Sequence, residues 1–166
     1  MSFDRRHFMI SAGAGGLVLA VGCSPSGRAS AAPEHYEINL TPDQWRKRLT
    51  PGQYNILRDA GTEPPFTSPL NKEHRSGIFS CAGCALPLFS SRTKYDSGTG
   101  WPSFWQPLPR AVATSTDNEL GFARTEVHCT RCGGHLGHVF DDGPRPTGKR
   151  YCMNGVALKF LAGPTA

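Results

Sequence analysis

Cysteine is the residue type in this chain whose spacing points most directly to chemistry. Four of the six cysteines form two C-x-x-C pairs, Cys81 with Cys84 and Cys129 with Cys132. Four thiolates at this spacing can surround one zinc ion tetrahedrally, and a closed set of four ligands leaves no position for a substrate. The pattern therefore predicts a structural zinc ion. Two disulfides, or iron in a rubredoxin-like site, are the alternatives, because ligand type alone does not separate iron from zinc.

Cys152 has no such pairing. It lies in the segment Arg150–Asn154, and Lys149 and Arg150 precede it. Nearby cations lower the pKa of a thiol and so favour the nucleophilic thiolate. This context predicts a reactive cysteine. The alternative is a buried, inert cysteine in a strand.

Two further patterns favour the reactive cysteine. His135 and His138 follow the second cysteine pair in a glycine-rich stretch, and an imidazole can hold or give a proton near neutral pH. Trp101 lies in Gly98–Trp105, bracketed by glycine and proline. A tryptophan in such a loop can wall a shallow apolar pocket. Together these residues indicate a site for a small substrate near Cys152.

Two short helices are expected ahead of the cysteine pairs, at residues 41–49 and 51–60. Each begins with Thr-Pro-x-Gln, at Thr41 and at Thr50. Threonine at the N-cap, proline at the first helical position and glutamine at the third form the signature of a helix start. Gly61 is expected to end the second helix.

The chain beyond the loop at residues 63–70 has the pattern of short strands broken by turns, which predicts antiparallel sheets. Each C-x-x-C is expected in a tight turn between two strands, with Gly83 and Gly133 relieving the backbone. A turn is expected at residues 117–121. The expected strands are residues 77–80, 86–89, 111–115, 122–128 and 151–160, the last beginning near Cys152.

Composition limits the classes of protein to consider. The chain has 166 residues, only 38% of them hydrophobic, with 19 Gly and 14 Pro. This suits one turn-rich domain with a modest core, for which a metal ion would compensate. The net charge of +5 is mild and scattered. We therefore expect no nucleic-acid partner.

The N-terminal residues have the pattern of an export signal. The twin-arginine segment Arg5–Met9 is followed by an apolar stretch that ends at Gly22, too short for a transmembrane span of about 20 residues. Residues 1–31 are predicted to be the signal and residues 32–166 the mature domain, in the periplasm or another extracytoplasmic space. Cleavage after Ala31 is favoured, and a lipid anchor at Cys23 is the alternative.

Several of these segments, taken together, resemble the methionine-R-sulfoxide reductases, the MsrB or SelR family. The resemblance covers roughly residues 38–161 and keeps the family's order. It is carried by Cys81–Cys84, Lys94–Phe104, Arg124–Cys129, His135–Pro144 and Arg150–Asn154.

The resemblance implies a mainly β fold of two antiparallel β-sheets with short N-terminal helices, and zinc at the four paired cysteines. It implies reduction of methionine-R-sulfoxide, free or in oxidised proteins, to methionine. Cys152 falls on the family's nucleophile, and Trp101 falls on the residue that packs against the substrate's S-methyl group. The other pocket residues that it implies are His135, His138, Asn154, Phe140, Arg150 and Asp142.

The chemistry of these residue types fits that reaction. The Cys152 thiolate would attack the electrophilic sulfoxide sulfur, and His138 would protonate the departing oxygen, assisted by His135 or Asp142. Asn154 would orient polar groups by hydrogen bonding. Methionine would leave, with Cys152 as a sulfenic acid.

Two positions depart from the family's pattern. Many members carry a second, resolving cysteine where this chain has Thr99. Serine is common where it has Gly155, which adds backbone freedom beside Asn154. With four cysteines assigned to metal, Cys152 has no partner in its own chain. We therefore expect its sulfenic acid to be reduced by an external thiol, from a thioredoxin-like protein or a small molecule.

Other classes of protein remain as alternatives. A zinc-ribbon-type binding module without enzymatic activity would explain the four paired cysteines but not Cys152. An iron-containing electron carrier, or a peroxidase or disulfide reductase that uses Cys152, are further alternatives. The protein is expected to be a monomer without a transmembrane span.

Overall fold

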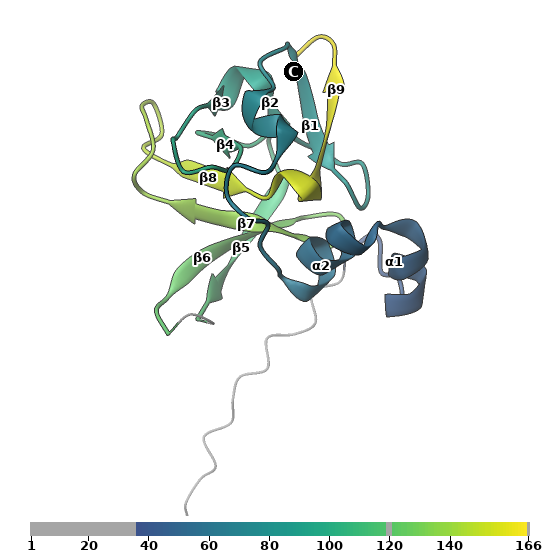
Figure 1. Ribbon diagram of the computed structural model, residues 1–166. Coiled ribbons are helices and arrows are strands. Elements are labelled where there is room, and N and C mark those ends of the chain that lie inside the picture. Colours follow the sequence, from purple (N-terminus) through teal and green to yellow (C-terminus); the bar gives the residue numbers. More distant parts are fainter. Residues whose placement is uncertain (1–35, 119–120, 166) are drawn as a thin grey trace, which may run out of the picture. The chain divides into compact units, whose positions relative to one another are not determined.

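The computed structural model describes residues 36–118 and 121–165 (Figure 1). The predicted fold class is confirmed, because the chain is mainly β with two antiparallel sheets and short N-terminal helices. The described residues form nine strands, which are β1 (Gly77–Cys81), β2 (Pro87–Ser90), β3 (Lys94–Tyr95), β4 (Ser103–Phe104), β5 (Val112–Asp117), β6 (Arg124–Cys129), β7 (His135–Phe140), β8 (Arg150–Met153) and β9 (Leu158–Ala162).

The strands form a three-stranded sheet of order β2-β1-β9 and a six-stranded sheet of order β3-β4-β8-β7-β6-β5. In the described residues no helix is long and apolar enough to cross a membrane. The predicted export signal, its cleavage site and Cys23 lie outside the described residues.

Two helices precede the sheets, α1 (Pro42–Arg48) and α2 (Pro51–Asp59). Each begins with the predicted capping box. At α1 the Gln44 amide donates to Thr41 Oγ1 over 3.3 Å, and the Thr41 amide donates to Gln44 Oε1 over 2.9 Å. The end of α2 differs from the prediction, because Ala60 rather than Gly61 takes the left-handed conformation, with φ of 52°.

The core between the two sheets is aromatic. Phe104 of β4 stacks on Phe89 of β2, with ring centroids 4.4 Å apart, and meets the edge of Phe79 of β1 at 5.0 Å. All three are fully buried, as is Met153 at the end of β8. Burial of Phe104 therefore fixes β4, and with it the loop residues that immediately precede this strand.

The prediction of one continuous strand at residues 151–160 is wrong. The segment divides into β8 and β9, which belong to different sheets, with the 3₁₀ turn η3 (Gly155–Ala157) between them. The reason lies in a buried carboxyl group that the sequence did not reveal. Glu63 accepts the backbone N–H groups of Gly155 and Val156, so these donors are not available to a strand ladder.

The pairing of the central strands β7 and β8 sets the positions of the polar residues. In this pairing His138 lies opposite Cys152, and on the other side of β7 it lies opposite Glu126. Gly137 makes the pairing possible, because its φ is +152° and a Cβ there would lie 2.1 Å from the Cys152 carbonyl oxygen. No residue with a side chain fits this position without moving β8.

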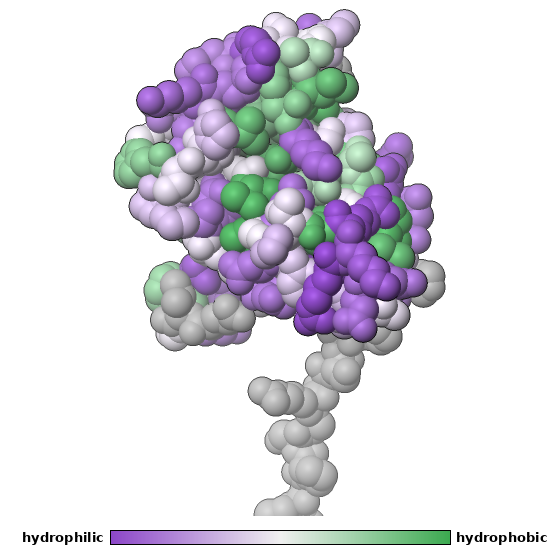
Figure 2. Space-filling view, turned by 45° about the vertical axis from the view of Figure 1, so that its right-hand side comes forward, coloured by the Kyte–Doolittle hydropathy of each residue, from purple (hydrophilic) through white to green (hydrophobic). Residues whose placement is uncertain are grey.

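Exposed apolar residues are spread over the surface. On the face seen in Figure 2, hydrophobic residues form separate groups between hydrophilic ones. Within residues 36–118 and 121–165, the large hydrophobic side chains that are exposed come from distant segments of the chain. They are Phe66, Phe122, Val156 and Leu161.

Candidate active site and metal centre

The two C-x-x-C pairs meet as predicted, in the turns between β1 and β2 and between β6 and β7. Their four Sγ atoms all lie within 4.8 Å of one another. The separation is 3.8 Å between Cys81 and Cys132 and 3.5 Å between Cys84 and Cys129. A tetrahedral ion with bonds of about 2.3 Å holds its sulfurs about 3.8 Å apart, whereas a disulfide needs about 2.05 Å. The four thiols can therefore hold one metal ion.

The four cysteines are sealed beneath α2. None of them is more than 5% exposed. Leu57 of α2 packs so closely over the first turn that a Cβ added at Gly83 would lie 3.4 Å from it. Arg58 donates to the Cys132 carbonyl oxygen over 2.9 Å. Gly133 has φ of +65° as expected, but in the first turn Ala85 rather than Gly83 takes the left-handed conformation. A site with four protein ligands and no solvent access suits a structural ion.

A separate pocket of about 120 Å³ opens at the middle of the six-stranded sheet. This volume is well below the roughly 300–1,000 Å³ of pockets for drug-sized ligands, so the pocket suits a small group. Five of the predicted residues line it, together with Thr62, Arg124 and Gly137. The predicted five are Cys152, Trp101, His138, Phe140 and Asn154.

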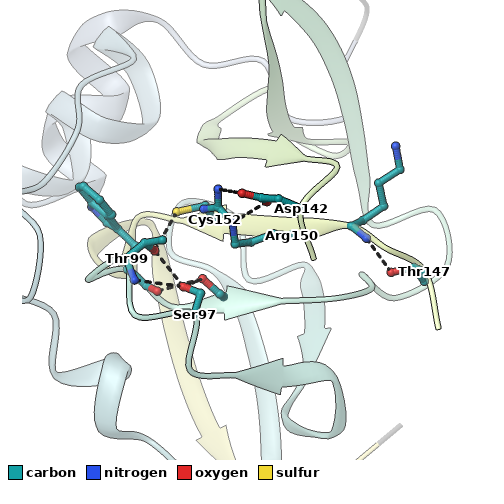
Figure 3. Close-up of polar contacts among 9 residues, drawn as sticks. Ser97, Thr99, Asp142, Thr147, Arg150 and Cys152 are labelled. Atoms are coloured by element: carbon teal, nitrogen blue, oxygen red, sulfur yellow. Dashed lines mark hydrogen bonds and ion pairs between the residues drawn. The ribbon is translucent and has the colours of Figure 1, made fainter. Parts of the chain in front are cut away.

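The thiol of Cys152 lies at the end of a chain of hydroxyl groups (Figure 3). Thr99 Oγ1 is 3.8 Å from Cys152 Sγ, and Ser97 Oγ connects Thr99 Oγ1 at 2.8 Å with Ser103 Oγ at 2.7 Å. Thr99 therefore occupies the position next to the reactive sulfur from which a resolving cysteine would act.

The expectation of an acidic Cys152 is wrong in sign. Burial raises the pKa of the Cys152 thiol above its ordinary value, because it disfavours the thiolate, and Thr99 and Arg150 only partly offset this. Arg150 is two residues from Cys152 and shares its face of β8. Lys149 contributes nothing comparable, since its ammonium group pairs with Asp141 at the surface.

Arg150 and Asp142 form the rim rather than the lining of the pocket. The Arg150 guanidinium donates to both Asp142 carboxylate oxygens, over 2.8 and 2.9 Å, and lies 4.3 Å from the Phe140 ring centroid. This pairing lowers the pKa of Asp142, so its carboxyl group stays ionised at neutral pH. Asp142 is therefore unsuited to the predicted role of assisting proton transfer.

His138 is bonded to a carboxylate that sequence reasoning missed. Its Nε2 lies 2.7 Å from Asp117 Oδ2, and the same oxygen accepts from Arg124 over 2.5 Å. Burial lowers the pKa of His138 despite Asp117, so the imidazole is neutral at pH 7. The turn predicted at residues 117–121 includes Asp117, whereas in the structure Asp117 is the last residue of β5 and lies opposite Arg124 of β6.

His135 stands behind His138 rather than in the Cys152 pocket. The register of β6 with β7 shifts at a β-bulge between Val127 and His128, so that the side chains of His135 and His138 lie on the same side of the sheet. Their ring centroids are 5.4 Å apart. His135 Nδ1 lies 2.7 Å from Glu126 Oε1, and this bond lowers the pKa of Glu126 to about 2.

The two histidines share a second hollow of about 210 Å³ with Asp117 and Glu126. The only sequence signal for Glu126 was the two-residue alternation of β6, which places it on one face with Arg124. Gly155 also has a different reason from the one expected. A Cβ there would lie 1.9 Å from Ser68 Oγ, so glycine lets the Ser68 side chain approach closely, and a serine at this position would require Ser68 to move.

A half-buried thiol facing a histidine–carboxylate pair and a tryptophan wall, on a two-sheet β fold with a separate four-cysteine centre, defines a small thiol enzyme. The comparisons with known proteins agree with this class. The SelR domain model matches residues 49–162, and the chain belongs to this family, as the sequence predicted.

The relatives cover most of the chain. The peptide methionine sulfoxide reductase MsrB of Leptospira interrogans is 55% identical over 127 residues, which are 76% of this chain and 97% of that protein. The protein of the same name from Leifsonia xyli is 53% identical over 132 residues, 78% and 95% of the two chains. Peptide methionine sulfoxide reductase B1, chloroplastic, of Arabidopsis thaliana is 47% identical over 154 residues, 88% and 76% of the two chains.

The four-cysteine centre predicts one metal ion per chain of residues 32–166. In Cys84→Ser a buried ligand is lost, and we expect the ion to be released and the free energy of unfolding to fall by at least about 3 kcal/mol, part of the roughly 10–16 kcal/mol with which structural zinc binds small domains. Elemental analysis and urea denaturation measure the two effects. Cys152→Ser, which keeps all four ligands, should retain the ion. A fully loaded Cys84→Ser protein would contradict the assignment.

The environment of Cys152 predicts how its alkylation by iodoacetamide depends on pH. Only the thiolate reacts, and the pKa is raised, so the rate should increase with pH beyond the ordinary cysteine midpoint of about 8.5. Arg150→Met removes a charge that lowers this pKa, and should shift the midpoint to higher pH. Lys149→Met, the adjacent matched change, should leave it in place. An equal shift in both variants would rule out the specific role of Arg150.

Proposed function

We propose that this protein reduces methionine-R-sulfoxide, free or in oxidised proteins, to methionine, with Cys152 as the nucleophile. The observation that carries the proposal is the pairing of β7 with β8, which sets His138 opposite Cys152 in one small pocket beside Trp101. The relatives are named peptide methionine sulfoxide reductases, which supports the substrate class.

The groups of this pocket are sufficient to balance the reaction in atoms and electrons. Cys152 Sγ attacks the sulfoxide sulfur, and the thiol proton passes through His138 to the sulfoxide oxygen. This attack forms a bond between Sγ and the substrate sulfur. The protonated oxygen then moves from the substrate sulfur to Sγ as the S–O bond and the new S–S bond break, which leaves Cys152 as a sulfenic acid and releases methionine. The substrate sulfur gains the two electrons that the cysteine sulfur loses.

The proton comes from the thiol itself. The pKa of Cys152 is raised and that of His138 is lowered, so both groups are neutral at pH 7. A thiol with a neutral imidazole holds the same number of protons as a thiolate with an imidazolium. His138 therefore needs only to accept one proton and pass it on, and Asp117 stabilises the charged ring while it does so.

The other pocket residues hold the substrate. Trp101 supplies a flat apolar wall for the S-methyl group, and Asn154 supplies an amide for the polar oxygen. Phe140 closes the side on which Arg150 stacks. His135 acts only through His138 and Glu126, as a support for the ring that moves the proton.

Zinc is the metal we propose for the four-cysteine centre. A buried, closed set of four thiolates fits zinc as a structural ion, and the ion would take no part in the reaction. Colourless protein with one zinc per chain is the expected form. Red protein would instead indicate iron at the same ligands.

The catalytic cycle requires another molecule. Thr99 has no thiol to offer Cys152, and the remaining described cysteines are buried in the metal centre. One external thiol would displace water from the sulfenic acid to form a mixed disulfide, and a second thiol would release Cys152. A thioredoxin-like dithiol carrier is the reductant we propose. The twin-arginine segment at Arg5–Met9 supports a periplasmic or other extracytoplasmic location, free or anchored at Cys23, with oxidised exported proteins as substrates.

Two other functions are less well supported. A zinc-ribbon-type binding module would leave the pocket around Cys152 without a purpose. A peroxidase or disulfide reductase would use the same thiol, so the substrate decides between the enzymes.

The direct test is the consumption of racemic N-acetylmethionine sulfoxide with dithiothreitol, followed by separation of the epimers. We expect the R form to disappear and the S form to remain. Cys152→Ser should lose all activity while keeping its metal. If the R form is not consumed by metal-loaded protein, the proposed function is wrong.

The geometry at Thr99 predicts a change in the recycling route. In Thr99→Cys the new sulfur would replace a hydroxyl that lies 3.8 Å from Cys152 Sγ. After one turnover, wild-type protein should react with dimedone, which labels sulfenic acids, whereas Thr99→Cys should form an internal disulfide and lose at least about nine-tenths of this label. Thr147→Cys, on the loop at the far end of β8 (Figure 3), is the matched control and should keep the dimedone label. An internal disulfide of Cys152 in wild-type, metal-loaded protein would overturn the external route.

A further inference from the structure

Glu63 occupies an unusual place in the loop before the first strand. It is only 6% exposed, although its segment has no helix or strand. Its carboxyl oxygens accept the backbone N–H of Gly155 at 2.5 Å and that of Val156 at 3.0 Å. A buried carboxyl group is costly unless its oxygens are satisfied, so these two bonds fix the side chain in one position.

The backbone of the same residue holds two walls of the Cys152 pocket. The Glu63 carbonyl oxygen accepts from Trp101 Nε1 over 3.0 Å, and the Glu63 amide donates to Asn154 Oδ1 over 3.0 Å. Trp101 and Asn154 lie 53 positions apart in the chain and belong to different segments. One residue therefore joins the apolar and the polar wall of the pocket directly.

The bond to Asn154 also orients its side-chain amide, because the Oδ1 atom accepts from the Glu63 amide. With Oδ1 occupied by the Glu63 amide, the NH₂ group is the remaining polar end. One of its hydrogens is used by the Leu136 carbonyl oxygen at 3.3 Å. An amide nitrogen has two donors, so one is left for an oxygen in the pocket that Asn154 lines.

We propose that Glu63 is a positioning residue that sets the spacing between the Trp101 wall, the Asn154 amide and Cys152. The side chain anchors the loop to the turn after β8, and the anchored backbone then orients the two walls. Glu63 does not itself touch the reacting atoms. The inference rests on the proposed function for its kinetic readout, but the position of Trp101 can be measured without activity.

The test is Glu63→Gln, which keeps the size of the side chain but places an NH₂ group against a backbone N–H. We expect KM for N-acetylmethionine-R-sulfoxide to rise and kcat/KM to fall by about 10- to 100-fold, as expected for a misplacement of about 1 Å. The indole N–H resonance of Trp101 should shift in a ¹H–¹⁵N spectrum. The alkylation rate of Cys152 and the metal content should stay unchanged, which a general loss of folding would not allow.

Two further proteins make the test specific. Glu37→Gln is the same change at an exposed site, and should leave kcat/KM and the Trp101 resonance as in wild type. Trp101→Phe keeps an aromatic wall but cannot donate to the Glu63 carbonyl oxygen. In the Trp101→Phe protein, Glu63→Gln should raise KM by a smaller factor than in wild type. The reason is that Trp101→Phe has already removed the hydrogen bond through which Glu63 orients this wall of the pocket. Equal factors in both backgrounds would overturn the proposal.

A second variant covers the case in which Glu63→Gln does not fold. Glu63→Asp keeps the carboxyl group but is one methylene shorter, so it cannot reach both N–H groups without moving the loop. It should show an intermediate KM and an intermediate shift of the Trp101 resonance. Wild-type KM together with an unchanged resonance would refute the positioning role. An inactive wild type whose Trp101 resonance still shifts in the Glu63 variants would instead refute only the proposed function.

Discussion

The pairing of β7 with β8 is the contact on which the rest of the site depends. β7 begins just after the second C-x-x-C turn, so the four-cysteine centre fixes one end of it. Gly137 has no side chain and lets β8 approach, and the register then brings His138 opposite Cys152. A shift by one residue would turn every side chain of β8 to the other face and separate the thiol from the imidazole. The metal centre thus serves the chemistry through strand register rather than through contact.

Burial has opposite effects on the two groups that this register brings together. It raises the pKa of the Cys152 thiol and lowers that of the His138 imidazole, so each prefers its neutral form. The Asp117 carboxylate opposes this effect of burial on the pKa of His138, and the Arg150 guanidinium opposes it on the pKa of Cys152. Each group is therefore neutral in the free pocket, yet each has a charged neighbour that can stabilise its ionised form.

Local signals in the sequence predicted the local structure well. The Thr-Pro-x-Gln starts of both helices were predicted because each depends on residues within a few positions, and the four-cysteine cluster was predicted because its spacing is typical of metal ligands. The contacts that Glu63 and Asp117 make with distant segments were not predicted. Glu63 meets residues about 90 positions away, and Asp117 reaches His138 only through the register of β5, β6 and β7. The pKa of Cys152 was misjudged because charge is visible in a sequence whereas burial is not.

The sulfur atoms of the described chain differ sharply in exposure. The four paired cysteines and Met153 are at most 5% exposed, whereas Cys152 is partly exposed to solvent. An oxidant that meets the folded domain therefore finds one sulfur, and oxidation of that sulfur to a sulfenic acid is reversible. The metal ligands are shielded from the same attack, and the only methionine of the described residues is out of reach. The domain can thus operate under oxidising conditions that damage other proteins without accumulating oxidised sulfur atoms of its own.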